Sequence, residues 1–136
     1  MTWQEALREI EDRQGILSAE DVVSRARDKK SPLHPKFVWD DSVAGQLYRI
    51  HQARNLIRVY VEVLPEVEDN IEHNVYVSLK DDRYDGGGYR SIVSVMQDSE
   101  LRASLLNDAK QELRYFKGKY NMLKELANVF EEIDKL

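Results

Sequence analysis

Hydrophobic residues in the first thirty positions recur at three- and four-residue steps, the spacing of an amphipathic helix. Thr2 followed by Glu5 has the form of a capping box, which favours a helix start at this point. Gly15 suits the left-handed conformation in which many helices end. Ser18 then predicts a second helix, over residues 19 to about 28, because serine is a good N-cap and acidic residues follow it.

Pro32 predicts the end of the second helix, because the residue before a proline is driven out of the helical region. We expect residues 33–39 to form an ordered extended crossing, since its large apolar side chains would each gain about 1.5–3 kcal/mol from burial. Asp40 or Asp41 is expected to cap a third helix over residues 42–56. The expected inner face of that helix consists of apolar side chains, namely Val43, Ala44, Leu47, Tyr48 and Ile50.

The spacing changes from helical to alternating near residue 57, which predicts β-structure. Residues 57–64 and residues 74–79 each alternate apolar and polar side chains, and an acidic loop joins them. The sequence therefore predicts one antiparallel hairpin. The side chains expected on its inner side are Ile57, Val59, Val61, Val63, Val75, Val77 and Leu79, whereas Arg58, Tyr60 and Glu62 are expected outside.

After a glycine-rich connector and a short helix, Asp98 or Ser99 is expected to cap a long final helix. Its apolar and aromatic residues follow a heptad pattern through four heptads, the pattern of a coiled coil. Gly118 destabilises this helix by about 1 kcal/mol relative to alanine, because glycine has a low helix propensity. The seam serves either a dimer or packing against the N-terminal helices within one chain. The residues expected at a dimer interface are Leu106, Leu113, Phe116, Tyr120, Leu123 and Phe130.

Together these elements predict an α+β protein that forms one structural domain overall. Residues 1–80 are expected to be a helical part with one β-hairpin, in the element order of a winged helix. Residues 81–98 are the connector and short helix, and residues 99–136 are a long C-terminal helix of coiled-coil type.

Composition narrows the classes of function. The chain has 136 residues, no cysteine and three histidines, so we expect no thiol nucleophile, no metal centre and no cofactor. It has no apolar run long enough to span a bilayer, and we expect a soluble cytoplasmic protein without membrane contact. Net charge is −5, but residues 18–60 carry eight basic and five acidic side chains. The basic region therefore coincides with the predicted second and third helices.

Two kinds of catalytic or ligand site are conceivable, and we favour neither. His34 and His51 with the Asp40–Asp41 pair have the residue types of a general base, but no spacing brings them together. The run DGGGYR exposes backbone N–H groups that can hold a phosphate, yet it lacks the lysine of a Walker A loop. Its acidic neighbours, which argue against a bound anion, are Asp81, Asp82 and Asp85. These carboxylates could attract a divalent cation instead, but the spacing of an EF-hand is absent. We therefore expect no enzyme activity.

Nucleic acid is a stronger candidate, because the third helix of a winged helix enters the major groove. The side chains expected to contact bases are Arg49, Gln52, Arg54, Asn55 and Arg58, and those expected near phosphates are Arg25, Arg27, Lys29 and Lys30. The long connection before the third helix, the acidic hairpin loop and the negative net charge weigh against DNA. The alternative is a protein-interaction module that self-associates or binds a host protein through its C-terminal helix and acidic surface.

Several motifs resemble those of a family of small proteins from tailed phages and prophages. They are ARDKKSPLH, FVWDD, YR, QARNLIR and GGGYR, followed by the closing helix. The resemblance covers most of the chain and implies a phage-derived gene expressed in a bacterial cytoplasm. It implies no catalytic residue or cofactor, but it favours a role in DNA transactions, regulation, packaging or host takeover.

Overall fold

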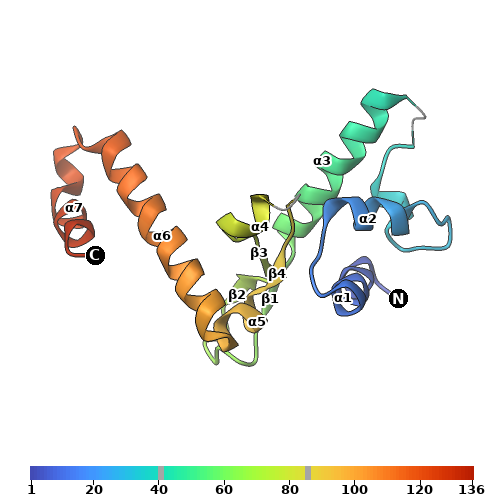
Figure 1. Cartoon of the computed structure of the whole chain (residues 1–136), viewed down its shortest axis with the longest axis horizontal. Helices are drawn as coiled ribbons and strands as arrows, with labels where there is room; N and C mark the ends of the chain where they lie inside the picture. The colour runs from blue at the N-terminus through green and yellow to red at the C-terminus, as the bar shows by residue number, and fades with distance from the viewer. Residues whose placement is uncertain (40–41, 85–86) are drawn as a thin grey trace. The chain divides into compact units, whose positions relative to one another are not determined.

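The computed structural model describes residues 1–39, 42–84 and 87–136 (Figure 1). In this part the chain is an α+β protein, in which helices and two small antiparallel sheets precede a long C-terminal helix. The chain divides into two compact units, residues 1–94 and residues 95–136. Residues 81–98, expected to be a connector, are thus shared between the two units.

The first two helices follow the sequence signals closely. Helix α1 (Trp3–Gln14) begins at Thr2, whose hydroxyl accepts the Glu5 N–H at 3.1 Å, and ends at Gly15 with φ of 79°. Helix α2 (Ala19–Ala26) begins at Ser18, whose hydroxyl accepts the Asp21 N–H at 3.1 Å. Both predicted caps are confirmed, because each side chain satisfies an N–H that lacks a partner in the first turn.

The crossing after α2 is anchored but not extended throughout. A 3₁₀ turn, η1 (His34–Lys36), interrupts it, so the expectation of an extended segment is wrong there. Proline at the second position of this turn supplies a fixed φ that suits a helical turn. Leu33 and Phe37 are buried on either side of the turn, and the Trp39 indole N–H donates to the His34 carbonyl at 3.0 Å.

Helix α3 (Val43–Val59) is longer than predicted and is rotated about its axis. Its N-cap is Ser42, which accepts the Gly45 N–H at 3.0 Å; the expected caps Asp40 and Asp41 lie outside the described residues. The predicted inner face is wrong except at Ile50, which is half-buried against the core, because the buried residues recur at four-residue steps along a different side. These buried residues are Gly45, Arg49, Ala53 and Ile57, whereas Val43, Leu47 and Tyr48 are exposed.

The first sheet is shorter than expected because α3 continues to Val59. Strands β1 (Val61–Val63) and β2 (Glu72–Asn74) pair antiparallel, with Glu62 opposite His73. The expected inward set is wrong for Val59, Val61 and Val63, which are exposed, while Tyr60 and Leu64 are buried. Helical spacing from Ile57 to Tyr60 explains the change, since three residues span about one turn of a helix.

A second small sheet was not predicted. Strands β3 (Tyr76–Val77) and β4 (Arg90–Ser91) pair antiparallel, and the short helix α4 (Lys80–Tyr84) lies between them in the chain. Leu17 and Tyr89 form an additional bridge, in which each N–H donates to the other carbonyl at 2.8 Å. The segment after the glycine-rich run is thereby attached to the turn between α1 and α2.

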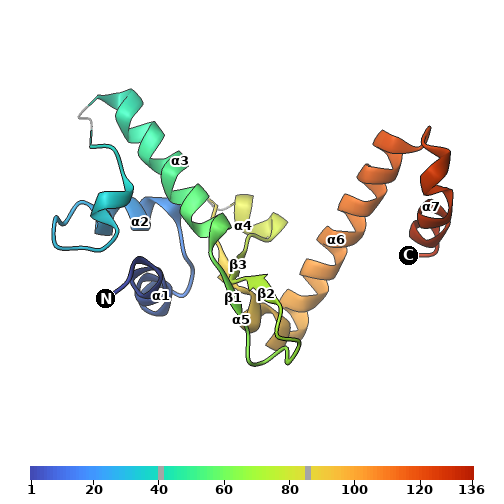
Figure 2. The same ribbon diagram turned by 180° about the vertical axis from the view of Figure 1, so that it is seen from behind.

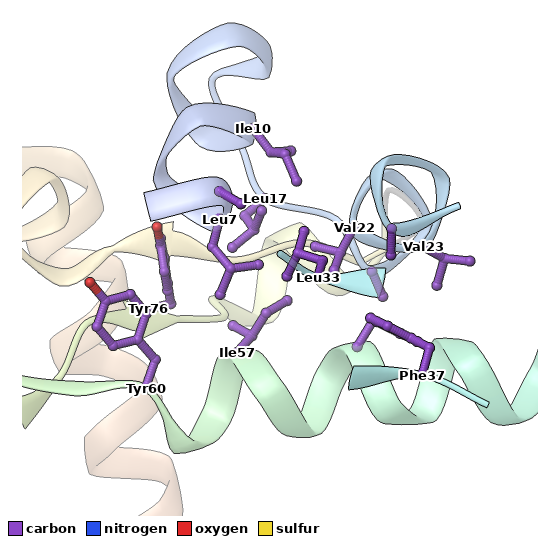
Figure 3. Packing of buried hydrophobic residues seen from close by; sticks show 14 of the residues in the cluster. Leu7, Ile10, Leu17, Val22, Val23, Leu33, Phe37, Ile57, Tyr60 and Tyr76 are labelled. Carbon is purple, nitrogen blue, oxygen red and sulfur yellow. The ribbon is translucent and has the colours of Figure 1, made fainter. Parts of the chain in front are cut away.

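The hydrophobic core belongs to the N-terminal unit (Figure 3). Side chains from α1, α2, the crossing, α3 and the sheet region meet there, and Leu7, Leu17, Val22, Leu33 and Ile57 are completely buried. Each such side chain contributes roughly 1.5–3 kcal/mol relative to exposure. Residues 1–94 therefore have a core of their own.

The C-terminal unit contains α6 (Ser99–Tyr120), η2 (Lys124–Leu126) and α7 (Ala127–Asp134), preceded by α5 (Ile92–Gln97). Asp98 caps α6 and accepts two backbone N–H groups. The expectation of one helix through residue 136 is wrong, because α6 ends at Tyr120 and α7 turns back beside its C-terminal end (Figure 2). Folding back buries Phe130 and Ile133, which a straight helix would leave in water.

Candidate binding surfaces

The outer face of α3 carries three of the residues predicted to contact bases. Arg54, Asn55 and Arg58 are exposed. Arg54 and Arg58 are four residues apart, so they lie on one side of the helix about one turn from each other. Gln52 is half-buried instead, and its side-chain oxygen accepts the Val38 N–H at 3.1 Å. The structure therefore leaves a pair of arginines and one amide on this face.

Arg49, the remaining predicted base contact on α3, lies on the inner face. It is 1% exposed, so its expected place on the outer face is wrong. Its guanidinium lies over the Trp39 ring, 5.0 Å from the centroid, and donates to the Val38 carbonyl at 3.3 Å. An aromatic face and a carbonyl compensate a buried guanidinium in part. Its spacing of four and eight residues from the buried Ala53 and Ile57 is the sequence signal that could have placed it.

The basic residues around the end of α2 are only partly available to a ligand. Arg25 is held by the Glu9 carboxylate at 3.0 Å. Arg27 is exposed, with its guanidinium 5.7 Å from the centroid of an indole ring. Lys29 and Lys30 are exposed in the turn that follows α2. Arg25 is therefore less accessible to a phosphate than the two lysines are.

The first half of α3 offers apolar rather than polar side chains. Val43 is 77% exposed, Leu47 is 69% exposed and Tyr48 is 51% exposed. A recognition helix of the helix-turn-helix class contacts base edges mainly with its N-terminal residues. Gln46 is exposed in this part of α3, but most of its exposed side chains are apolar and cannot hydrogen-bond to base edges.

The hairpin that follows α3 is strongly acidic. The carboxylates of β1, β2 and their connection are Glu62, Glu66, Glu68, Asp69 and Glu72. Asp69 binds the His73 ring at 2.7 Å, and the Ile71 N–H together with that ring lowers the pKa of the Asp69 carboxyl. A cluster of acidic side chains such as this repels a phosphate backbone.

The glycine-rich run has a structural explanation in this fold. Gly87 has φ of 81°, a conformation that favours glycine. A Cβ at Gly88 would lie 2.5 Å from the Cδ1 atom of Ile16, so any larger residue here would require the Ile16 side chain to move. The Arg90 guanidinium makes two hydrogen bonds of 2.9 Å to the Asp82 carboxylate. The arginine beside the run is thus paired within the chain, which disfavours the phosphate-binding alternative.

His34 and His51 each have contacts of their own in the fold, and the Asp40–Asp41 pair of the general-base hypothesis lies outside the described residues. The His34 ring stacks on Trp39, with centroids 4.8 Å apart, and its Nδ1 bonds to the Ala26 carbonyl at 2.8 Å. His51 lies 3.3 Å from the Asn55 side-chain nitrogen. Asp85 lies outside the described residues. Among those that are described, no group of three or more histidine, aspartate or glutamate side chains is placed to hold a metal ion.

A polar cluster between α1 and the sheet region was missed by sequence analysis. Glu62 accepts hydrogen bonds from both Arg8 and the Tyr60 hydroxyl. Burial and the bond to Glu62 raise the pKa of Tyr60 to about 12. Burial also raises the pKa of the Glu11 carboxyl. The contact of Arg8 with Glu62 ties α1 to β1, and alternation patterns carry no signal for such a contact between distant segments.

Helix α6 exposes the apolar stripe that the heptad pattern predicts. All 22 of its residues are described and none of them is buried. On α6, Leu106 is 56% exposed, Leu113 is 41% exposed and Phe116 is 40% exposed. Of the other residues predicted for a dimer interface, Leu123 is exposed, Tyr120 is half-buried and Phe130 is buried.

Helix α7 covers only the C-terminal end of this stripe. The rings of Phe116 and Phe130 lie 6.4 Å apart, and Lys117 forms an ion pair with Asp134. Because α7 has 8 residues against 22 in α6, it lies beside only the C-terminal part of α6 (Figure 1). Leu106 and Leu113 are the exposed leucines of the stripe on α6.

Comparisons with known proteins found no matching family model, no matching curated protein and no matching solved structure. In the described ranges, none of the helices combines the length and apolar character needed to cross a membrane.

Proposed function

We propose that this chain is a non-enzymatic protein-interaction module, and that it binds other protein chains through α6. The N-terminal unit has its own core and serves as the body that α6 brings to a partner. In keeping with the phage resemblance, the setting proposed for this interaction is a bacterial cytoplasm.

The observation that supports the proposal most strongly is the stripe on α6. A 22-residue helix with leucines and a phenylalanine on one side and no buried residue presents apolar surface that water solvates poorly. Apolar surface of this kind, bordered by charged side chains, is typical of a protein-binding site. An amphipathic helix offers its partner anchors at three- and four-residue steps.

Site-specific photo-crosslinking of the full chain in bacterial cells tests this function. A photoreactive amino acid replaces Leu106 on the stripe or, as the matched control, the neighbouring exposed Asn107 on the other side of α6. We expect adducts of higher mass from position 106 and few from position 107. Equal yields from both positions, or none from either, would contradict a binding surface on this stripe.

A second candidate is duplex DNA, bound by the outer face of α3 in the manner of a winged helix. The observation that favours it is the exposed pair Arg54 and Arg58, one turn apart on the same side of the helix. The acidic hairpin next to α3 and the apolar first half of that helix weigh against DNA, so we rank it second.

An electrophoretic shift assay over a range of salt concentrations tests the DNA candidate. If both arginines contact phosphates, the Arg54→Ala/Arg58→Ala variant should reduce the slope of log affinity against log salt by about two. The control is Lys119→Ala/Lys124→Ala, which removes the same charge from the C-terminal unit. Absence of any shift at low salt would exclude this function.

A further inference from the structure

We infer that the partner of α6 is a second copy of this chain, paired in parallel along Leu106, Ala109, Leu113 and the exposed part of Phe116. The inference rests on the proposed function and names its partner. In the resulting dimer the two α6 helices form a short parallel coiled coil, and each α7 stays packed on the C-terminal end of its own α6, where Phe130 lies against Phe116.

The size of the C-terminal unit supports a second copy. Units of about 40 residues bury too little surface to be stable unless oligomerisation, a metal or disulfides assist them. Residues 95–136 contain no cysteine, and their buried apolar residues are Val95, Phe130 and Ile133. Pairing with another copy would supply the missing apolar contacts, because the same stripe lies on both chains.

The geometry of the stripe suits pairing between identical helices. Leu106 and Leu113 occupy one heptad position, and Ala109 and Phe116 occupy the other, so they form one seam with a spacing of 3.5 residues. Ala109 lies at the midpoint of α6, between Ser99 and Tyr120. Its small side chain permits close approach of two helices at the centre of the seam.

Charge specifies the parallel orientation. With this heptad assignment, Glu112 and Lys119 lie on one edge of the seam, and Lys110 and Lys117 lie on the other. Lys117 already pairs with Asp134 of its own chain, so in a parallel pair Glu112 of the other copy is a second carboxylate beside that lysine, whereas an antiparallel pair places like edges together. Residues 99–136 carry seven basic and seven acidic side chains, so net repulsion between two C-terminal units is absent.

The absence of cysteine from the chain makes disulfide trapping specific. Single Leu106→Cys and Ala109→Cys variants of the full chain are oxidised and separated without reductant, and Asn107→Cys serves as the control on the other side of α6. In a parallel dimer, residue 106 of one chain lies close to residue 106 of the other, and the same holds for residue 109. Both variants should therefore form covalent dimers, and the control should not. Trapping at position 109 alone would overturn the parallel pairing.

Sedimentation and light scattering of the unmodified chain provide the second measurement. We expect a mass that rises from monomer to dimer with concentration, and Leu113→Glu should raise the dissociation constant at least about 100-fold, because it buries an unpaired charge. A monomer at every concentration would overturn the inference. If the chain is a monomer but crosslinked adducts specific to residue 106 still form in cells, the proposed interaction function stands and the partner is a different protein. If the chain is a monomer and no such adducts form, the proposed function is wrong as well.

Discussion

Arg49 shows how a single residue can change roles between sequence and structure. As part of an arginine-rich helix it resembles a nucleic-acid contact, but its position on the inner face makes it part of the packing. A guanidinium is tolerated there because an indole face and a backbone carbonyl lie against it. Burial therefore decides which arginines of α3 can serve a ligand.

We expect Arg49→Ala to lower the free energy of unfolding by about 2–4 kcal/mol, because it removes a large buried side chain and its contact with Trp39. Urea unfolding followed by tryptophan fluorescence measures this change. The exposed Arg54→Ala is the matched control, with an expected effect within about 0.5 kcal/mol. Similar losses in both variants would contradict the structural role of Arg49.

The Glu11 carboxyl predicts a pH dependence of stability. Burial raises its pKa in the folded state, so the folded state binds this proton more tightly than the unfolded state does. The stabilising contribution of this group is present below the unfolded pKa, near 4.3, and is lost as pH rises through the folded pKa. We therefore expect Glu11→Gln to raise the melting temperature at neutral pH.

Thermal unfolding of Glu11→Gln and the unmodified chain between acidic and neutral pH tests that dependence. The difference in melting temperature should shrink as pH falls below about 4, because the carboxyl becomes protonated in both states only well below its unfolded pKa. The neighbouring exposed Asp12→Asn removes the same charge without a buried group and should show a much smaller difference. A gap that stays constant over the whole pH range would argue against a perturbed Glu11.

At the scale of elements, local signals predicted the helix starts and the end of α1 at Gly15 well, but the ends of α3 and α6 poorly. The side chains that cap α1, α2 and α6 satisfy backbone groups a few residues away, so the sequence carries the information locally. The end of α3 and the break after Tyr120 depend on which distant side chains bury Tyr60, Phe130 and Ile133. That tertiary choice is invisible to a periodicity argument.

The candidate site was likewise predictable only in part. The heptad positions of α6 follow from spacing alone, and the structure leaves most of them exposed as an interface requires. The predicted basic face of α3 included Arg49, which is buried. The buried side of the helix differs from the side that its first apolar residues mark. Val43 and Leu47 are apolar and four residues apart, so the sequence predicts that they lie on the buried face, although both are exposed.

The segment from Gly87 to Ser91 gives a prediction about how elements approach each other. A methyl group at Gly88 would overlap Ile16, so we expect Gly88→Ala to cost about 1–3 kcal/mol of stability. Ile16→Ala should relieve most of that cost, which a double-mutant cycle in urea measures. The control is Gly118→Ala in α6, where a Cβ meets nothing within 4 Å and alanine should stabilise by about 1 kcal/mol. Additive effects at positions 16 and 88 would exclude the overlap.

At the scale of the whole molecule, the two units differ in what holds them together. The N-terminal unit contains the large core, and both tryptophans, Trp3 and Trp39, belong to it. The C-terminal unit contains most of the exposed apolar stripe and little core. Under the proposed pairing, the stability of the second unit therefore depends on the concentration of the chain, whereas that of the first does not.

Thermal unfolding at several protein concentrations separates these contributions. Tryptophan fluorescence reports only the N-terminal unit, and far-ultraviolet circular dichroism reports the helices of both. We expect a fluorescence midpoint that is independent of concentration, and a second dichroism component that moves to higher temperature as concentration rises, because dimer formation stabilises only α6 and α7. Leu113→Glu should abolish that shift and leave the fluorescence curve unchanged. Coincident curves that ignore concentration would mean instead that α6 and α7 share one cooperative core with the rest of a single chain.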